Sequence, residues 1–277
     1  MADYLPLFLT LLATGAFAGV IAGLFGIGGG VIIVPALAFA FEQLGFTEVS
    51  MHAAVGCSLA TIVATSIRSA MAHHKRGAVD LDVMKGWIPW IMVGSILGAA
   101  IASYLPGEGM KAVFGSILIL VSLQFIFGRP NWTLSPHLPT GLPKVGIAGG
   151  MGALSGIMGI GGGAFGVTLM TLCGHSVHRA VGTAATFGAA IGFPAAIGYA
   201  ITGLGVEGRP PFSIGYLNIP AIVIIGVMTT TIAPLGAMLA HRMDAVTLKR
   251  VFGSVMIVIA LNMIRVAVGL PLPFTGG

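Results

Sequence analysis

The sequence predicts an all-α, polytopic membrane protein built from two inverted repeats of about five helical segments each. The first observation is its composition: of the 277 residues, 56% are hydrophobic and only 8% are charged. Soluble domains carry about 25% charged residues, so this chain has too few to cover a surface that faces water. The composition excludes a nucleic-acid-binding module, a secreted disulfide scaffold and a soluble metabolic enzyme. A membrane β-barrel would instead show alternating strands of about ten residues.

Apolar runs, separated by Gly, Pro and charged residues, are the second observation, and they predict five segments in each half. The first five are expected at residues 4–26, 30–43, 51–73, 85–104 and 109–127. The second five are expected at residues 145–160, 163–174, 178–202, 215–240 and 246–269. A polar, Pro-rich connector at 129–144 separates the first membrane repeat, 1–128, from the second, 145–277.

An internal duplication is the third observation, because three groups of residues recur in the same order and at nearly the same offset. Gly19, Gly23, Gly26, Ile27, Gly28, Gly29 and Gly30 recur as Gly152, Gly156, Gly159, Ile160, Gly161, Gly162 and Gly163. His52, Ala54, Val55 and Gly56 recur as His178, Ala180, Val181 and Gly182. Lys111, Val113, Phe114, Gly115 and Ser116 recur as Lys249, Val251, Phe252, Gly253 and Ser254. Internal repeats of this kind are typical of transporters.

The lengths of the segments indicate how the repeats are related. The segments at 30–43 and 163–174 are short, since a spanning helix needs about 20 residues. We expect each to form a hairpin with the segment before it, either re-entrant or tilted and fully spanning. Either hairpin returns the chain to the side it left, and three single spans follow. Three is an odd number, so the second repeat is expected upside down relative to the first.

The basic residues distinguish inverted from parallel repeats. Inversion places ten of them on or near one face and three toward the other. The ten are Arg68, Lys75, Arg76, Lys85, Arg129, Lys144, Arg179, Arg242, Lys249 and Arg250, and the three are Lys111, Arg209 and Arg265. A parallel repeat would divide them eight against five. The inverted arrangement gives the stronger positive-inside bias and predicts that both termini lie outside the cell.

The glycine-rich breaks are the first candidate binding site. Breaking a helix inside the membrane frees backbone amides that hydrocarbon cannot satisfy, so the break must face protein, water or a ligand. A helix that begins at Gly30 or Gly163 presents unpaired N–H groups and a positive dipole end. Two such ends entering from opposite faces predict an anion site that includes Gly28, Gly29, Gly30, Gly161, Gly162 and Gly163. The alternative is close helix packing, which the four-residue spacing of Gly15, Gly19 and Gly23 favours.

The acidic residues argue against a cation as substrate. All eight carboxylates are expected at segment ends or in loops, whereas cation transporters commonly place one within the membrane. An anionic or neutral substrate fits this distribution better. Cys57 and Cys173 are expected to act as packing residues, and no His, Cys or Asp cluster has zinc-ligand spacing. No metal, cofactor or catalytic residue is therefore predicted.

Other polar residues within the segments are candidates with structural alternatives. Small hydroxyls follow the two repeat-equivalent histidines and could line a polar track or bond to the i−4 carbonyl; these are Ser58, Thr61, Thr65, Thr183 and Thr186. Gln124 and Asn262 are repeat-equivalent amides suited to structural bonding or to substrate contact. His52 and His178 could serve as gates, as proton-coupling groups or as helix-end residues. Arg68 could line an inner vestibule or extend to the lipid headgroups.

The motifs carry a resemblance to a known family. They are GLFGIGGGVIIVPAL at 23–37, GIMGIGGGAFGVTLM at 156–170 and HAAVGCSLATIVATSIRSAMAHHKRGAVDL at 52–81. With them the chain resembles the sulfite exporter TauE/SafE family of membrane permeases from about residue 8 to 268. The resemblance implies transport of sulfite, sulfonates or related anions across the bacterial inner membrane, often outward. It also implies a substrate near the two triple glycines.

These observations predict a secondary anion transporter that works by alternating access, with export as the expected direction, and that is not an enzyme. An anion channel of the same architecture, or a carrier of another small organic anion, is the alternative. An intramembrane enzyme lacks a nucleophile with a matching base, and direct ATP hydrolysis lacks a P-loop. The expected partners are a small anionic substrate and membrane lipid, without nucleic acid, and a homodimer stays an open option.

Overall fold

The computed structural model describes residues 5–25, 29–128, 134–240 and 245–270. Within them the chain forms ten α-helices and one short β-hairpin. The helices of the first half are α1 (Leu5–Phe25), α2 (Gly30–Gln43), α3 (Ser50–Lys75), α4 (Leu81–Ala102) and α5 (Gly107–Phe127). Those of the second half are α6 (Gly141–Met158), α7 (Gly163–Leu172), α8 (Val177–Thr202), α9 (Ile219–Ala240) and α10 (Ala245–Ala267). Strands β1 (Ser213–Ile214) and β2 (Leu217–Asn218) precede α9.

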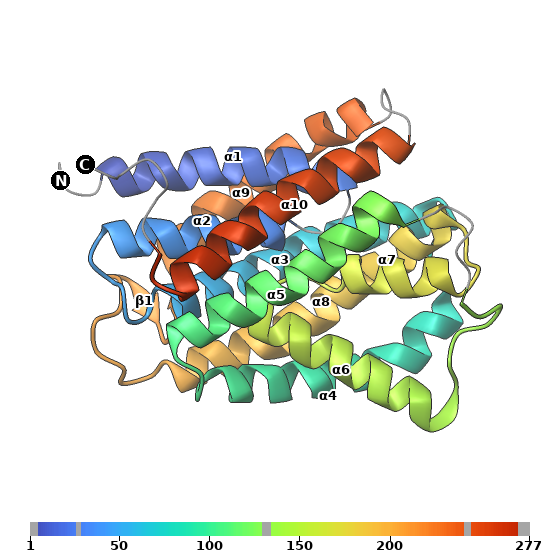
Figure 1. The fold of residues 1–277 in the computed structure, drawn as a ribbon, viewed down its shortest axis with the longest axis horizontal. Coiled ribbons are helices and arrows are strands. Elements are labelled where there is room, and N and C mark those ends of the chain that lie inside the picture. The colour runs from blue at the N-terminus through green and yellow to red at the C-terminus, as the bar shows by residue number, and fades with distance from the viewer. Residues whose placement is uncertain (1–4, 26–28, 129–133, 241–244, 271–277) are drawn as a thin grey trace.

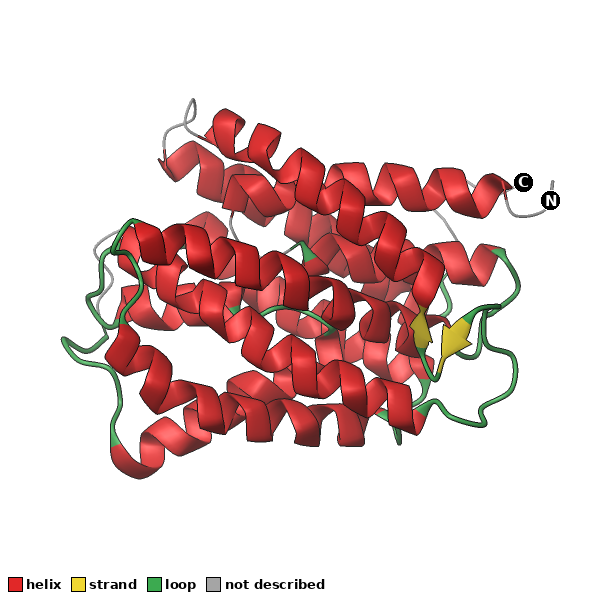
Figure 2. Cartoon of the chain, turned by 180° about the vertical axis from the view of Figure 1, so that it is seen from behind, coloured by secondary structure: helices red, strands yellow, loops and turns green. Residues whose placement is uncertain are grey.

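The helices lie side by side, with their axes roughly along one common direction (Figure 1). Five of them are long and apolar enough to cross a membrane: α3, α4, α5, α8 and part of α10. Shorter apolar stretches occur in α1, α2, α7 and α9. The start of α1 and the end of α10 lie at the same end of the bundle, and so does the β-hairpin (Figure 2). The architecture is therefore the predicted all-helical membrane fold.

Helices of one half pack along helices of the other. α1 lies alongside α9, where a Cβ atom built on Gly15 would come within 2.6 Å of the Cβ atom of Met228. α6 lies alongside α4, where a Cβ on Gly156 would come within 2.7 Å of the carbonyl oxygen of Ser95. Glycines at these contacts let the helix backbones approach closely, as is common in membrane proteins. Gly15 and Gly156 are thus packing positions.

The two longest helices, α3 and α8, pack antiparallel along each other. Between them they contact most of the other helices. Gly56, near the start of α3, faces Tyr199, near the end of α8, and Gly192 of α8 faces Leu59 of α3. Tyr199 and Leu59 are both fully buried. This pair joins the two halves along most of its length.

Several helix ends differ from the predicted positions for local reasons. α4 begins at Leu81 rather than at residue 85, because the Asp80 carboxylate caps it by accepting hydrogen bonds from the amides of Asp82 and Val83. α6 begins at Gly141, so the last four residues of the predicted connector belong to its first turn. Pro143 is tolerated there because first-turn amides have no intrahelical acceptor.

The connection between α8 and α9 folds back onto the start of α3. It contains the β-hairpin, so α9 begins at Ile219 and not at residue 215. Tyr216, in the hairpin turn, is buried, and its amide donates to the carbonyl of Tyr199 at 3.2 Å. The amide of Asn218 donates to the Cys57 sulfur at 3.1 Å. These contacts close the bundle at the end where α3 begins.

Candidate functional site

The two glycine-rich breaks lie against each other. A Cβ atom built on Gly30, the first residue of α2, would lie 2.6 Å from the carbonyl oxygen of Gly159 and 3.2 Å from the Cα of Ile160. Only glycine at position 30 permits this approach, because any Cβ would displace the backbone of the second break. The fold therefore brings together the two predicted breaks, one from each repeat.

Backbone conformation also requires glycine at the breaks. Gly29 and Gly159 adopt left-handed conformations, with φ of 75° and 69°. The Gly29 carbonyl accepts hydrogen bonds of 3.0 Å from the amides of Ile32 and Ile33, which starts α2. Gly28 lies outside the described residues.

The glycines of the second break are buried in tight packing. Gly161, Gly162 and Gly163 are all buried. A Cβ on Gly162 would lie 2.7 Å from the Cβ of Phe187 and 2.9 Å from Cδ1 of Ile191, both on α8. The packing role considered for these glycines is thus present, and substrate contact at the same positions stays a prediction.

Each glycine break is followed by a helix N-terminus. The first amides of any α-helix have no intrahelical acceptor, and the helix dipole is positive at that end. α2 starts at Gly30, at the contact with Gly159, and α7 starts at Gly163, four residues after Gly159. Such a site attracts an anion without any formal positive charge.

Ser58 is the predicted hydroxyl that reaches the breaks. Its Oγ donates a buried hydrogen bond of 2.7 Å to the carbonyl oxygen of Gly159. Thr61 lies one turn later and is also buried, but its hydroxyl donates to the Cys57 carbonyl of its own helix at 2.8 Å. Thr65 bonds to its own helix in the same way.

The two candidate hydroxyls of α8, Thr183 and Thr186, form hydrogen bonds near the turn between α3 and α4. The Thr183 hydroxyl accepts a 2.9 Å hydrogen bond from the amide of Asp80, in the turn between α3 and α4. The Thr186 hydroxyl donates to the Thr183 carbonyl at 2.6 Å. Both therefore have partners within the protein, and the structure does not bring their hydroxyls to the contact between the breaks.

The two repeat-equivalent amides have different surroundings. The Gln124 Oε1 on α5 accepts a 3.2 Å hydrogen bond from the Thr168 hydroxyl on α7. Asn262 is exposed and accepts from the guanidinium of Arg265, at 3.2 Å from Nε and 2.9 Å from Nη2. The structure places Gln124 beside the second hairpin and Asn262 on the outside of α10.

The histidine pair lies at opposite ends of the α3–α8 pair in unlike environments. His52 is buried, with Nε2 3.0 Å from the carbonyl oxygen of Ala102. A carbonyl oxygen only accepts, so Nε2 carries a proton. The ring stacks on Tyr216, with centroids 5.0 Å apart, which links His52 to the hairpin that closes this end. His178 is exposed, as is Arg68 near the far end of α3.

Two polar residues of the region were missed by reasoning from sequence. Ser155 is fully buried one turn before the second break, and its hydroxyl has no hydrogen-bond partner among the described residues. The Tyr199 hydroxyl donates to the carbonyl of Gly156 at 3.2 Å. A lone Ser in the run of small residues before the break was a usable signal for Ser155. Nothing in the sequence placed Tyr199 near it.

The His, Cys, Asp and Glu side chains stay dispersed in the part of the chain that the structure describes. No group of three or more His, Cys, Asp or Glu side chains gathers there. The features present at the breaks are neutral: helix termini, hydroxyls and carbonyls. Oxyanion binding by amide donors is the chemistry that such groups perform.

Comparison with known proteins assigns the family. The family model described as sulfite exporter TauE/SafE matches residues 11–263. The chain belongs to the TauE/SafE family. A probable membrane transporter protein of Haemophilus influenzae is 33% identical over 92% of this chain and 97% of its own length. A probable membrane transporter protein of Methanocaldococcus jannaschii is 26% identical over 95% of this chain and 97% of its own. No solved structure matches the chain.

The family assignment makes the protein a multi-pass membrane transporter. The match runs from α1 to α10 and includes both glycine breaks. The breaks, the β-hairpin and the α3–α8 pair are therefore features of one TauE/SafE transporter unit.

Proposed function

We propose that this TauE/SafE protein carries sulfite, organosulfonates or related small anions across the bacterial inner membrane by alternating access. The observation that carries the proposal is the contact between Gly30 and Gly159, which brings the N-terminus of α2 against the glycine break that precedes α7. Discontinuous helices with N-termini at a central site bind anionic groups in other transporters. The neutral breaks suit an anion, whose charge is balanced by dipoles.

Pseudo-symmetry between the halves supports the alternating-access part. A Cβ on Gly115 of α5 would lie 2.7 Å from Cγ1 of Ile264, and a Cβ on Gly253 of α10 would lie 2.6 Å from Cγ1 of Ile126. Gly115 and Gly253 are repeat-equivalent, and the same offset in sequence relates Ile126 to Ile264. Such reciprocal contacts are the mark of a two-fold axis. The antiparallel α3–α8 pair agrees with inverted halves that rock about the centre.

The distribution of charge supports an orientation with both termini outside. The ends of α3, α5 and α9 and the starts of α4, α6, α8 and α10 lie at one end of the bundle (Figure 1). Lys75, Lys85, Lys144 and Arg179 are at or near that end. By the positive-inside rule it faces the cytoplasm, and the end closed by the β-hairpin faces outward.

Counterflow of radiolabelled sulfite tests the proposal. Purified protein in liposomes loaded with unlabelled sulfite should accumulate label transiently, and taurine, sulfoacetate or sulfate should compete if they share the site. Saturable exchange identifies a carrier. Electrical current without exchange would identify an anion channel of the same fold. Folded protein that shows neither would overturn sulfite as the substrate.

A further inference from the structure

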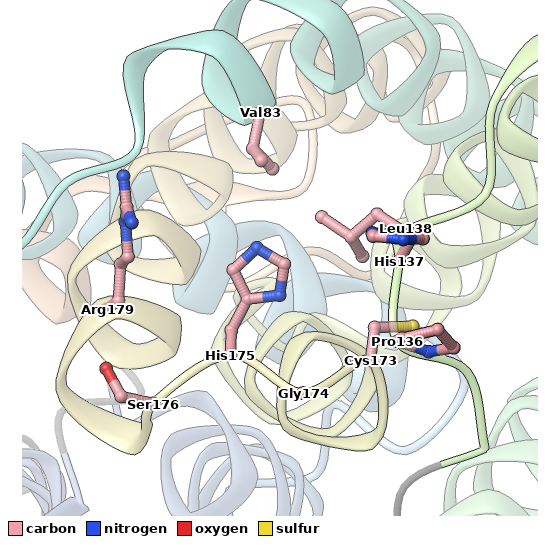
Figure 3. Close-up of a pocket in the computed structure, with 9 residues that line it drawn as sticks. All are labelled: Val83, Pro136, His137, Leu138, Cys173, Gly174, His175, Ser176 and Arg179. Carbon is pink, nitrogen blue, oxygen red and sulfur yellow. The ribbon is translucent and has the colours of Figure 1, made fainter.

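A cavity lies at the end of the bundle opposite the β-hairpin, apart from the glycine breaks. Its volume is about 590 Å³, within the range of small-molecule sites. Its walls come from the start of α4 (Val83), the 136–138 segment, the turn between α7 and α8, and the first turn of α8 (Figure 3). The segment is held in place because the Leu134 amide donates to the Leu172 carbonyl at 2.8 Å.

Three of the nine residues that line this cavity are basic: His137, His175 and Arg179. His175 projects between Arg179 on one side and His137 on the other (Figure 3). Nδ1 of His175 is buried and has no hydrogen-bond partner in the part of the chain that is described. The cavity also adjoins the N-terminus of α8, whose dipole adds positive potential.

Acidic groups offset only part of this charge. The Arg179 Nη2 lies 3.2 Å from the Asp80 Oδ2, and the Asp80 Oδ1 is occupied in capping α4. A guanidinium has five N–H donors, so one ion pair leaves others for a ligand. The Arg179 side chain is 57% exposed, which leaves it accessible from the cavity side.

The equivalent place in the first repeat holds an acid–base pair. His175 aligns with Glu42 at the offset in sequence that relates the two breaks. Glu42 pairs with Lys111 at 2.5 Å and accepts a hydrogen bond from the Ser50 hydroxyl at 3.1 Å. The second repeat has His175 where the first has the carboxylate. The acid–base pair of one end is thus replaced by a basic group that faces a cavity.

We propose that this cavity is a vestibule that binds the substrate oxyanion through Arg179, His175 and His137 before it reaches the glycine breaks. The proposal rests on the proposed function. α7 connects the two places: it ends at the cavity and begins at the second break. Its ten residues span about 15 Å, which is half of a hydrocarbon core of about 30 Å. A sulfite or sulfonate group offers three oxygens to these donors.

Transport kinetics test the vestibule with sulfite supplied on the cavity side. Arg179→Gln combined with His175→Gln should raise KM about three- to tenfold while the maximal rate stays near that of the wild type, because uniform binding is lost. Asp80→Asn should lower KM, since Asn keeps the helix cap and removes the competing charge. Arg76→Gln removes an exposed charge at the same end, outside the cavity lining, and should leave KM unchanged.

A binding measurement separates the vestibule from transport itself. Ser176 lines the cavity and is exposed, so in a Ser176→Cys variant ethanesulfonate bound there should slow alkylation of the new thiol by N-ethylmaleimide, but not when Arg179→Gln and His175→Gln are also present. The labelled peptide is quantified by mass spectrometry. Protection without sulfite counterflow would support the vestibule and overturn the proposed function. Counterflow with an unchanged KM in the double variant would overturn the vestibule and leave the function standing.

Discussion

Ser58 of the first repeat donates a 2.7 Å hydrogen bond to the carbonyl oxygen of Gly159 in the second. The bond joins α3 to the glycine break that ends α6, and both partners are buried. Gly159 is held in its left-handed conformation beside Val34 and Val55. The break is therefore fixed by a polar contact between the halves, and movement of one half against the other must strain or exchange it.

Removal of this hydroxyl should destabilise the protein. Ser58→Ala leaves a buried carbonyl without its donor, which costs about 1–3 kcal/mol. The thermal unfolding midpoint of the detergent-purified variant should be lower than that of the wild type. The sulfite counterflow rate is measured on the same preparations. The matched control is Thr65→Ala, because the Thr65 hydroxyl bonds only within α3. Equal midpoints for the two variants would contradict the structural role of Ser58.

Gly162 should not accept a side chain. In Gly162→Ala the new Cβ would lie 2.7 Å from the Cβ of Phe187, so the start of α7 must shift away from α8. Overpacking of this kind costs about 1–3 kcal/mol and should abolish counterflow in protein that still reaches the membrane. Gly150→Ala is the control, because no atom lies within 4 Å of its built Cβ. Normal transport by Gly162→Ala would remove the break from the transport site.

The β-hairpin should detach when its anchor is cut. Tyr216→Ala removes the stacking on His52 and opens space beneath residues 203–218. Hydrogen exchange of the backbone amides at positions 216 and 218 should then accelerate relative to the wild type. Ile214→Ala serves as the control, since Ile214 is 58% exposed in the same hairpin. Unchanged exchange in Tyr216→Ala would show that backbone bonds alone hold the hairpin.

Alkaline pH should loosen the packing of Tyr216 against His52. Burial raises the pKa of Tyr216 above its ordinary value of 10, and Arg209 opposes part of that shift. A raised pKa in the folded state means that the stabilisation is present below pH 10 and is lost as the pH rises through the folded value. Exchange of the hairpin amides should therefore accelerate, beyond the intrinsic rate increase, only above pH 10. Tyr216→Phe should abolish this extra dependence.

Single cysteines should report the orientation. Tyr104, after α4, is 89% exposed at the hairpin end, and Leu142, in α6, is 85% exposed at the other. In intact cells a membrane-impermeant maleimide should label Tyr104→Cys and spare Leu142→Cys, with the reverse in inverted vesicles. Both native cysteines are buried, which keeps the background low. The opposite pattern would place the termini inside.

The sequence by itself determined the membrane class, the ten segments and the duplication, because hydropathy and glycine spacing are local and leave their pattern in the chain. It also predicted that helices begin at Gly30 and Gly163 after glycine-rich breaks. Only the tertiary structure decided which polar groups meet. Ser58 faces the second break while Thr183 faces the Asp80 turn, although both were candidates for one polar track. Their directions depend on how α3 crosses α8, which no local pattern encodes.

The same reason explains the histidines and the cavity. His52 and His178 are equivalent in the repeat, but their surroundings differ. The α8–α9 connection, which is longer than the α3–α4 connection, buries His52, whereas His178 is exposed. The cavity around His175 is built from three segments distant in the chain. Side-chain packing between such segments sets burial and charge pairing, so it decided what the sequence could only offer as candidates.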